Sequence, residues 1–186
     1  MNEDREKLIK PHGGYKDLEA YKLSEIIYDA TVKFTARFID RRSRTVDQMV
    51  QAARSGKQNI AEGSMASGTS SKFEIKLISV ARASLEELLL DYQDFLRQND
   101  HELWPKDHPK AEYIRKMAYN KDKSYKTYRT YIEEKSRETA ANTMVCVIHQ
   151  ANFLLDRLMK ELEKSFIEAG GFTERMHGVR SQNRER

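Results

Sequence analysis

Cysteine, proline and glycine are scarce in this chain of 186 residues. Its single cysteine, Cys146, has no second cysteine to pair with, so an internal disulfide is excluded. Three prolines and eight glycines leave long stretches without a residue that breaks a helix. This composition favours long helices held together by packing, in a chain of suitable length for one domain.

Long hydrophobic runs are also absent. No stretch approaches the roughly 20 consecutive apolar residues that a membrane-spanning helix needs. Residues 1–10 are charged where a secretory signal would be apolar. We therefore expect a cytoplasmic protein that makes no membrane contact.

Charged residues, in contrast, are plentiful. They make up 33% of the chain against 39% hydrophobic residues, and the formal net charge is +4. This combination is typical of amphipathic helices with solvated outer faces. The mild basic excess permits an acidic partner such as RNA or DNA without identifying one.

Apolar residues recur at steps of three and four in four long segments, at about residues 17–41, 45–62, 71–99 and 140–169. We find neither an alternating strand pattern nor an internal repeat. Four such helices joined by turns predict an all-α protein, an up-and-down antiparallel four-helix bundle.

Polar side chains and glycines mark the expected helix ends. Thr45 with Gln48, and Ser71 with Glu74, have the spacing of capping boxes, in which each side chain satisfies a free backbone amide. The glycine pair at 170–171 is expected to end the last helix through a left-handed cap. These signals support the two middle helix starts and the last helix end.

Three segments fall outside the four stripes. Residues 1–14 are expected to form a flexible arm, and residues 172–186 a basic, polar tail that is disordered apart from at most a short helical turn. The bundle itself spans 15–171. It contains an insertion at about 100–131, in which Pro109 suits the first turn of a helix.

The most specific sequence in the chain is Gln58-Asn59-Ile60-Ala61-Glu62-Gly63-Ser64. Together with Tyr15-Lys16-Asp17-Leu18 and residues 73–90, it resembles the small four-helix-bundle proteins encoded in intervening sequences of bacterial 23S ribosomal RNA genes. A looser similarity is to the accessory variability determinant of diversity-generating retroelements, a homopentameric barrel that binds nucleic acid. The resemblance implies a four-helix bundle, a homo-oligomer (by the looser similarity a pentamer), and nucleic-acid binding. It implies no catalytic residue.

A first candidate binding surface is a basic cluster around the first turn and the outer face of the second predicted helix. Guanidinium groups bind phosphate in a bidentate manner, so these residues suit RNA or DNA. The alternative is a solvated helix face beside Asp40 and Asp47. The cluster comprises Arg37, Arg41, Arg42, Arg44, Arg54 and Lys57.

A second candidate lies in the insertion, where cations alternate with tyrosines. Such a row holds phosphates while bases stack on the rings, although tyrosines at this spacing are also common as packing residues. The cations are Lys121, Lys123, Lys126 and Arg129, and the rings are Tyr119, Tyr125, Tyr128 and Tyr131. A flexible arm could add nonspecific affinity through the tail arginines, with plain disorder as the alternative. These are Arg175, Arg180, Arg184 and Arg186.

A seam of small residues runs along the second predicted helix. Ala52, Gly56, Asn59 and Gly63 recur at steps of four, three and four. The seam allows close approach of another helix, either inside the bundle or in a second subunit. Asn59 needs a hydrogen-bond partner if it is buried.

Enzymatic patterns are incomplete. Gly56-Lys57 resembles part of a phosphate-binding loop, but Gln51 stands where the earlier glycine is required and no strand precedes it. The four predicted helices carry no Glu-x-x-His pair of the kind that di-metal bundles use. Cys146 and His149 lie one turn apart but are too few to hold a metal.

We therefore expect a non-enzymatic homo-oligomer without cofactor or metal that binds RNA or DNA through a basic surface. The rival hypothesis is a structural or protein-interaction scaffold whose charge only keeps it dissolved. Binding that weakens steeply as salt rises distinguishes the first hypothesis from the second.

Overall fold

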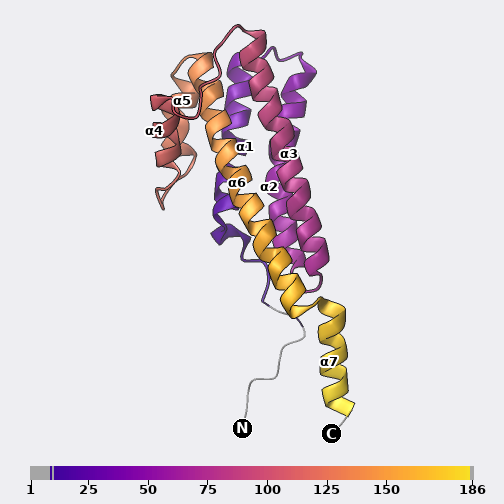
Figure 1. The fold of residues 1–186 in the computed structure, drawn as a ribbon. Helices are drawn as coiled ribbons and strands as arrows, with labels where there is room; N and C mark the ends of the chain where they lie inside the picture. Colours follow the sequence, from indigo (N-terminus) through magenta and orange to yellow (C-terminus); the bar gives the residue numbers. More distant parts are fainter. Residues whose placement is uncertain (1–8, 10, 185–186) are drawn as a thin grey trace.

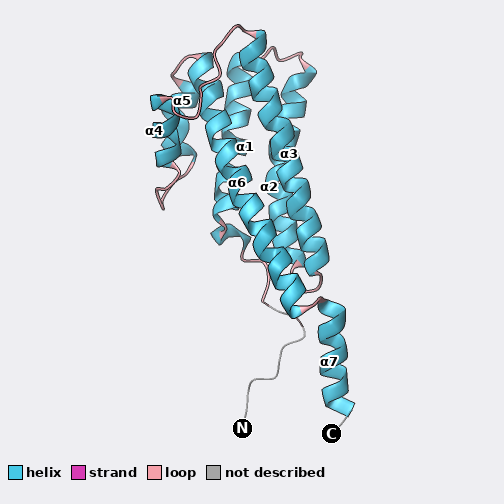
Figure 2. Ribbon diagram, viewed as in Figure 1, coloured by secondary structure: helices cyan, strands magenta, loops and turns pink. Residues whose placement is uncertain are grey.

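Every regular element of the chain is helical in the computed structural model, which describes residue 9 and residues 11–184 (Figure 2). No strand occurs in this part of the chain, which confirms the all-α prediction. The elements are η1 (Tyr15–Asp17), α1 (Glu19–Phe38), α2 (Arg44–Ala66), α3 (Ser71–Gln98), α4 (Pro109–Met117), α5 (Tyr125–Glu133), α6 (Arg137–Ala169) and α7 (Phe172–Arg184).

The four long helices α1, α2, α3 and α6 lie side by side (Figure 1). α2 packs against α3, α3 against α6, and α1 against both α2 and α6. The short helices α4 and α5 lie outside this group at one end, where α5 contacts α1 and α6. α7 lies beyond the other end (Figure 1).

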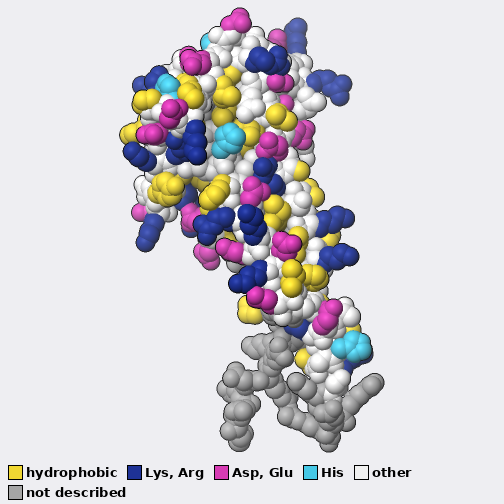
Figure 3. All heavy atoms as spheres, viewed as in Figure 1, with side chains coloured by type: hydrophobic (Ala, Val, Ile, Leu, Met, Phe, Trp, Pro, Cys, Tyr) yellow, Lys and Arg dark blue, Asp and Glu magenta, His cyan; other side chains and the backbone are white. Residues whose placement is uncertain are grey.

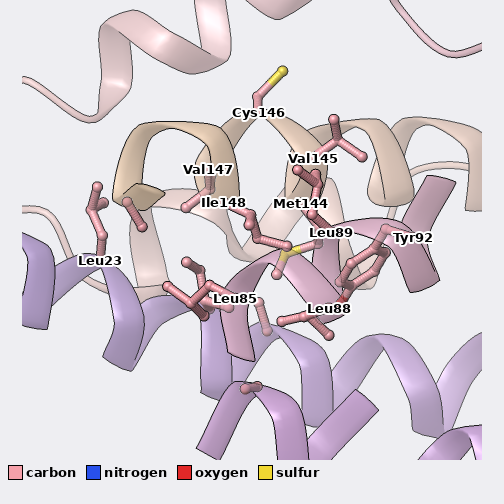
Figure 4. Close-up of a cluster of buried hydrophobic side chains, with 14 of the residues drawn as sticks. Leu23, Leu85, Leu88, Leu89, Tyr92, Met144, Val145, Cys146, Val147 and Ile148 are labelled. Atoms are coloured by element: carbon pink, nitrogen blue, oxygen red, sulfur yellow. The ribbon is translucent and has the colours of Figure 1, made fainter. Parts of the chain in front are cut away.

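The core fills the space between the long helices. Figure 4 shows side chains from α3, among them Leu85 and Leu88, meeting Met144 and Ile148 of α6. Tyr92 is fully buried, and its hydroxyl donates to Thr31 Oγ1 at 3.1 Å, so its polar atom has a partner in the apolar interior. The apolar stripes of the sequence therefore face one another.

The two expected capping boxes are wrong, because a serine slightly earlier caps each helix. Ser43 accepts from the backbone N–H of Thr45, and Ser70 accepts from that of Phe73. Both serines have extended backbones, as a capping residue requires, whereas Thr45 and Ser71 are already helical. The helix starts lie close to the expected positions although the capping residues differ.

The insertion consists of α4 and α5 with the loops around them. Pro109 is the first residue of α4, as predicted, and the ring of His108 caps the helix by accepting from the N–H of Lys110 at 3.2 Å. The same ring stacks on Trp104, with 4.9 Å between the centroids. His108 thus fixes the start of α4, a role that was not predicted from the sequence.

The end of α6 matches the expectation only in part. Gly170 has φ +67°, which only glycine adopts easily, but its ψ of 179° differs from a left-handed cap. The expectation of a disordered tail is wrong over residues 172–184, which form α7. Glu174 accepts from the N–H of Gly171 at 2.9 Å and so caps this helix at its start.

The expected flexible arm, residues 1–14, lies mostly outside the described residues. Within it, the N–H of Gly13 donates to the carbonyl of Ser64, near the end of α2, at 3.1 Å. None of the helices in the described part of the chain is both long and apolar enough to cross a membrane.

Candidate nucleic-acid interface

The turn between α1 and α2 carries the arginines Arg41, Arg42 and Arg44, which we call the arginine turn. All three are exposed, and within the described residues none forms an ion pair. The carboxylate of Asp40 accepts from the backbone N–H of Arg42 at 2.8 Å. One acidic neighbour of the turn is thus hydrogen-bonded to the backbone, and the three arginine side chains are exposed to solvent.

Two further predicted cations lie along α2. Arg54 is exposed and has no ion-pair partner among the described side chains. It lies ten residues after Arg44, or about 15 Å along the helix axis. Lys57 is half-buried, with its ammonium 4.5 Å from the centre of the Tyr28 ring. Arg54 is therefore an exposed charge separate from the arginine turn, whereas Lys57 is held against an aromatic ring.

Arg37, the sixth member of the basic cluster, is engaged by the protein itself. Its guanidinium donates to the carbonyl oxygens of Ile132 and Lys135, both at 2.8 Å, and lies 4.4 Å from the centre of the Phe38 ring. These carbonyls are at the C-terminal end of α5. Arg37 therefore ties α5 to α1, and we assign it a structural role.

The cations of the insertion do not form one surface. Lys123 is buried and forms an ion pair with Glu19. Arg129 pairs with Glu133 at 3.1 Å. Lys121 and Lys126 are exposed and have no ion-pair partner in the described part of the chain. The alternating cation row of the sequence therefore leaves two free charges.

The tyrosines of the insertion are likewise divided. Tyr128 is buried, and Tyr125 donates its hydroxyl to Glu133 at 2.7 Å. Burial raises the pKa of Tyr128 to about 12. Tyr131 is half-buried, whereas Tyr119 is 82% exposed. A row of stacking rings is therefore absent from this segment, and the interpretation as packing residues holds for Tyr125 and Tyr128.

Tyr119 instead lines a groove of about 460 Å³ beside α6. The exposed ring of Phe153 and the cation Arg157 belong to the same groove, as does Lys121. Phe153 was not predicted as a site residue, although it lies outside the apolar stripe of α6, where a large ring indicates exposure. The groove combines aromatic and basic residues, as was expected of the insertion. Of the predicted row, Tyr119, Lys121 and Lys123 line it, and Lys123 is already paired with Glu19.

The tail arginines lie on or beyond α7. Arg175 is half-buried, and its Nε and one terminal nitrogen have no hydrogen-bond partner among the described residues. It lines a small cavity with Glu74, whose burial raises its pKa to about 7. Arg180 is exposed, Arg184 ends α7, and Arg186 lies outside the described residues.

The small-residue seam lies between α2 and α3. A Cβ atom built on Gly56 would lie 2.6 Å from Leu85 Cδ2, so the two helices touch at this glycine. Asn59 donates to the carbonyl of Ser55 at 2.9 Å, and Ser55 hydrogen-bonds to Ser84 of α3. Gly56 and Gly63 of this seam therefore pack against α3 of the same chain.

The thiol of Cys146 is buried, which raises its pKa to about 11, and His149 on the next turn is exposed. Glu174 and His177 have the Glu-x-x-His spacing, but on α7, outside the four long helices. No group of three or more potential metal ligands occurs in the described part of the chain. We therefore assign no metal ligand to these residues.

Figure 3 shows how charge is distributed over one face of the molecule. Basic and acidic side chains are interspersed there, so that face offers no continuous basic track.

Comparison of the chain with protein-family models, with curated proteins and with solved structures gave no match. The arginine turn is thus the strongest candidate interface on the grounds of geometry and charge.

Proposed function

We propose that this protein is a non-enzymatic, self-associating up-and-down four-helix bundle that binds RNA or DNA through the arginine turn. The observation that carries the proposal is the presence of three exposed, unpaired arginines within four consecutive residues. Helices α4 and α5 lie outside this bundle at one end, and α7 lies beyond the other end (Figure 1).

The local geometry of the turn supports phosphate binding. Arg44 is the first residue of α2, at the end of the helix where the helix dipole favours a nearby anion. Each guanidinium presents a planar fork of donors that matches two phosphate oxygens. Asp40 accepts from the backbone of the turn, and among the described residues no ion pair joins it to these forks.

The test compares oligonucleotide binding by the wild type and by a triple variant, Arg41→Glu, Arg42→Glu and Arg44→Glu. Fluorescence anisotropy with a labelled single strand and a duplex, across a salt series, gives the affinity and its salt dependence. We expect the variant to bind at least tenfold more weakly. Its log affinity should fall about 2 to 3 units less steeply with log salt, because about three phosphate contacts are lost.

A matched control carries the same change in net charge at other sites: Lys106→Glu, Lys116→Glu and Lys160→Glu. These exposed lysines lie outside the basic cluster. If both triple variants lose affinity equally, the binding depends on net charge and the arginine turn is not the interface. If the wild type binds neither probe, the result favours a protein-interaction scaffold.

A further inference from the structure

The outer face of α3 carries a seam of residues with the spacing of a coiled coil. Its opposite face is buried against α2 and α6. Three apolar seam residues are widely exposed, namely Phe73 at 50%, Val80 at 40% and Leu90 at 55%. Steps of three and four place all members on one side of the helix. The α3 seam comprises Phe73, Lys76, Val80, Ala83, Glu87, Leu90, Asp94 and Arg97.

Charge is distributed unevenly along the α3 seam. Its N-terminal half carries Lys76, whereas its C-terminal half carries Glu87 and Asp94. Asp91 beside them has a raised pKa because of its burial and the nearby charges of Glu87 and Asp94. Arg97 pairs with Asp94 at 2.8 Å but is one cation against the two carboxylates of this half. The C-terminal half therefore keeps a net negative charge, which favours a cation from outside the chain.

The sequence of the seam is complementary to itself when it is reversed. Consider two antiparallel copies of α3 whose two-fold axis crosses the helices at the level of residue 85. In this register Lys76 faces Asp94 of the second copy, and Val80 faces its Leu90. In the same register, Phe73 faces Arg97 of the second copy, and a guanidinium over an aromatic ring forms a favourable cation–π interaction. A parallel arrangement would oppose Lys76 to Lys76 and Asp94 to Asp94, which repel each other.

We propose that α3 pairs with α3 of a second copy of this chain in an antiparallel, two-fold contact along the α3 seam. The inference rests on the self-association included in the proposed function and specifies its surface. Each copy uses the same patch, so the contact closes at two subunits. A pentameric ring, which the looser resemblance implies, requires a contact between two different patches instead.

The first experiment exchanges the charges that face each other. Lys76→Asp and Asp94→Lys each place like charges opposite one another, twice per dimer, whereas the double variant restores the pairing in reverse. We expect sedimentation equilibrium to give twice the monomer mass for the wild type. Each single variant should raise the dissociation constant at least tenfold, and the double variant should recover most of the loss.

The matched control is Lys126→Asp on α5, a helix that does not pack against α3. It changes the charge by the same amount and should leave the dissociation constant unchanged. Circular dichroism of every variant shows whether the fold is retained, so a lost dimer is not confused with an unfolded chain.

The second experiment fixes the register with cysteines. In the antiparallel pair, Val80→Cys lies opposite Leu90→Cys of the second copy, but about 15 Å along the axis from its own equivalent. Each variant alone should therefore stay uncrosslinked under mild oxidation, whereas an equal mixture should form a covalent dimer. The native Cys146 is buried and so provides a low background.

The outcomes separate this inference from the proposed function. A wild type that remains monomeric at high concentration overturns both self-association and the α3 contact. An oligomer that ignores the charge exchange and forms no mixed disulfide overturns the α3 contact alone. A mass of five copies likewise overturns the α3 contact alone. Oligonucleotide binding by the arginine turn is measured independently of all three outcomes.

Discussion

At the scale of single residues, Gly56 shows how little space separates α2 from α3. A Cβ atom at this position would lie 2.6 Å from Cδ2 and 2.8 Å from Cγ of Leu85, a side chain that is itself fully buried. Leu85 has no solvent-exposed space into which it can turn. The helix propensity lost by using glycine is thus offset by close packing.

Gly56→Ala is therefore expected to destabilise the protein, although alanine is the better helix former. Overpacking of a tight core costs about 1 to 3 kcal/mol, which exceeds the gain of about 1 kcal/mol in helix propensity. Urea unfolding followed by circular dichroism measures the change. Gly178→Ala is the control, since its new methyl group meets nothing within 4 Å. A Gly56→Ala protein as stable as the wild type would show that the helices can separate freely.

Glu74 gives the stability of the protein a defined pH dependence. Burial raises its pKa to about 7 from 4.5, so the folded protein binds this proton more tightly than the unfolded chain does. Stability therefore falls as the pH rises from about 4.5 to 7 and then levels off. Glu74→Gln is neutral at every pH and removes this loss.

We expect Glu74→Gln to raise the melting temperature at pH 8 by more than it does at pH 4.5. Thermal unfolding at both pH values measures the difference. Glu163→Gln, at an exposed position of α6, is the matched control and should change the melting temperature little at either pH. An equal effect of Glu74→Gln at the two pH values would contradict the assigned protonation.

At the scale of elements, the insertion is held to the long helices by a few specific contacts. Arg37 of α1 donates to the carbonyl of Ile132, in the last turn of α5, and to that of Lys135, just after it. Lys123, before α5, pairs with Glu19 at the start of α1. Both ends of α5 are thereby attached to the same long helix, which suits a segment too short to be stable alone.

Arg37→Ala is expected to loosen α5 rather than unfold the bundle. It removes two charge-assisted hydrogen bonds at a partly solvated site, worth about 1 to 2 kcal/mol in total. Hydrogen exchange should show faster exchange of the amides of residues 125–133, with α2 and α3 unchanged. Arg41→Ala, at an exposed arginine without a partner, should leave α5 protected. Equal exchange in the two variants would argue against the attachment.

At the scale of the whole molecule, apolar spacing predicted the long helices because each one buries a continuous stripe. The capping serines were missed because each lies close to another residue that can cap a helix: Thr45 lies two residues after Ser43, and Ser71 directly follows Ser70. The fate of Lys123 was not predictable from its neighbours, since its partner, Glu19, lies far away in the sequence. The arginine turn was predictable because its residues are contiguous, whereas the groove at Phe153 depends on how the insertion folds back on α6.

If the arginine turn binds nucleic acid and α3 pairs as proposed, the position of the turn also determines how the dimer would contact its ligand. The ring of Phe34 lies 4.9 Å from that of Phe95, so the turn after α1 lies at the same end as the C-terminus of α3. In an antiparallel α3 pair, the two turns would point in opposite directions, separated by about the length of α3, on the order of 40 Å. Such a dimer would be bivalent: it would bridge two strands, or two distant stretches of one strand, rather than bind at a single site.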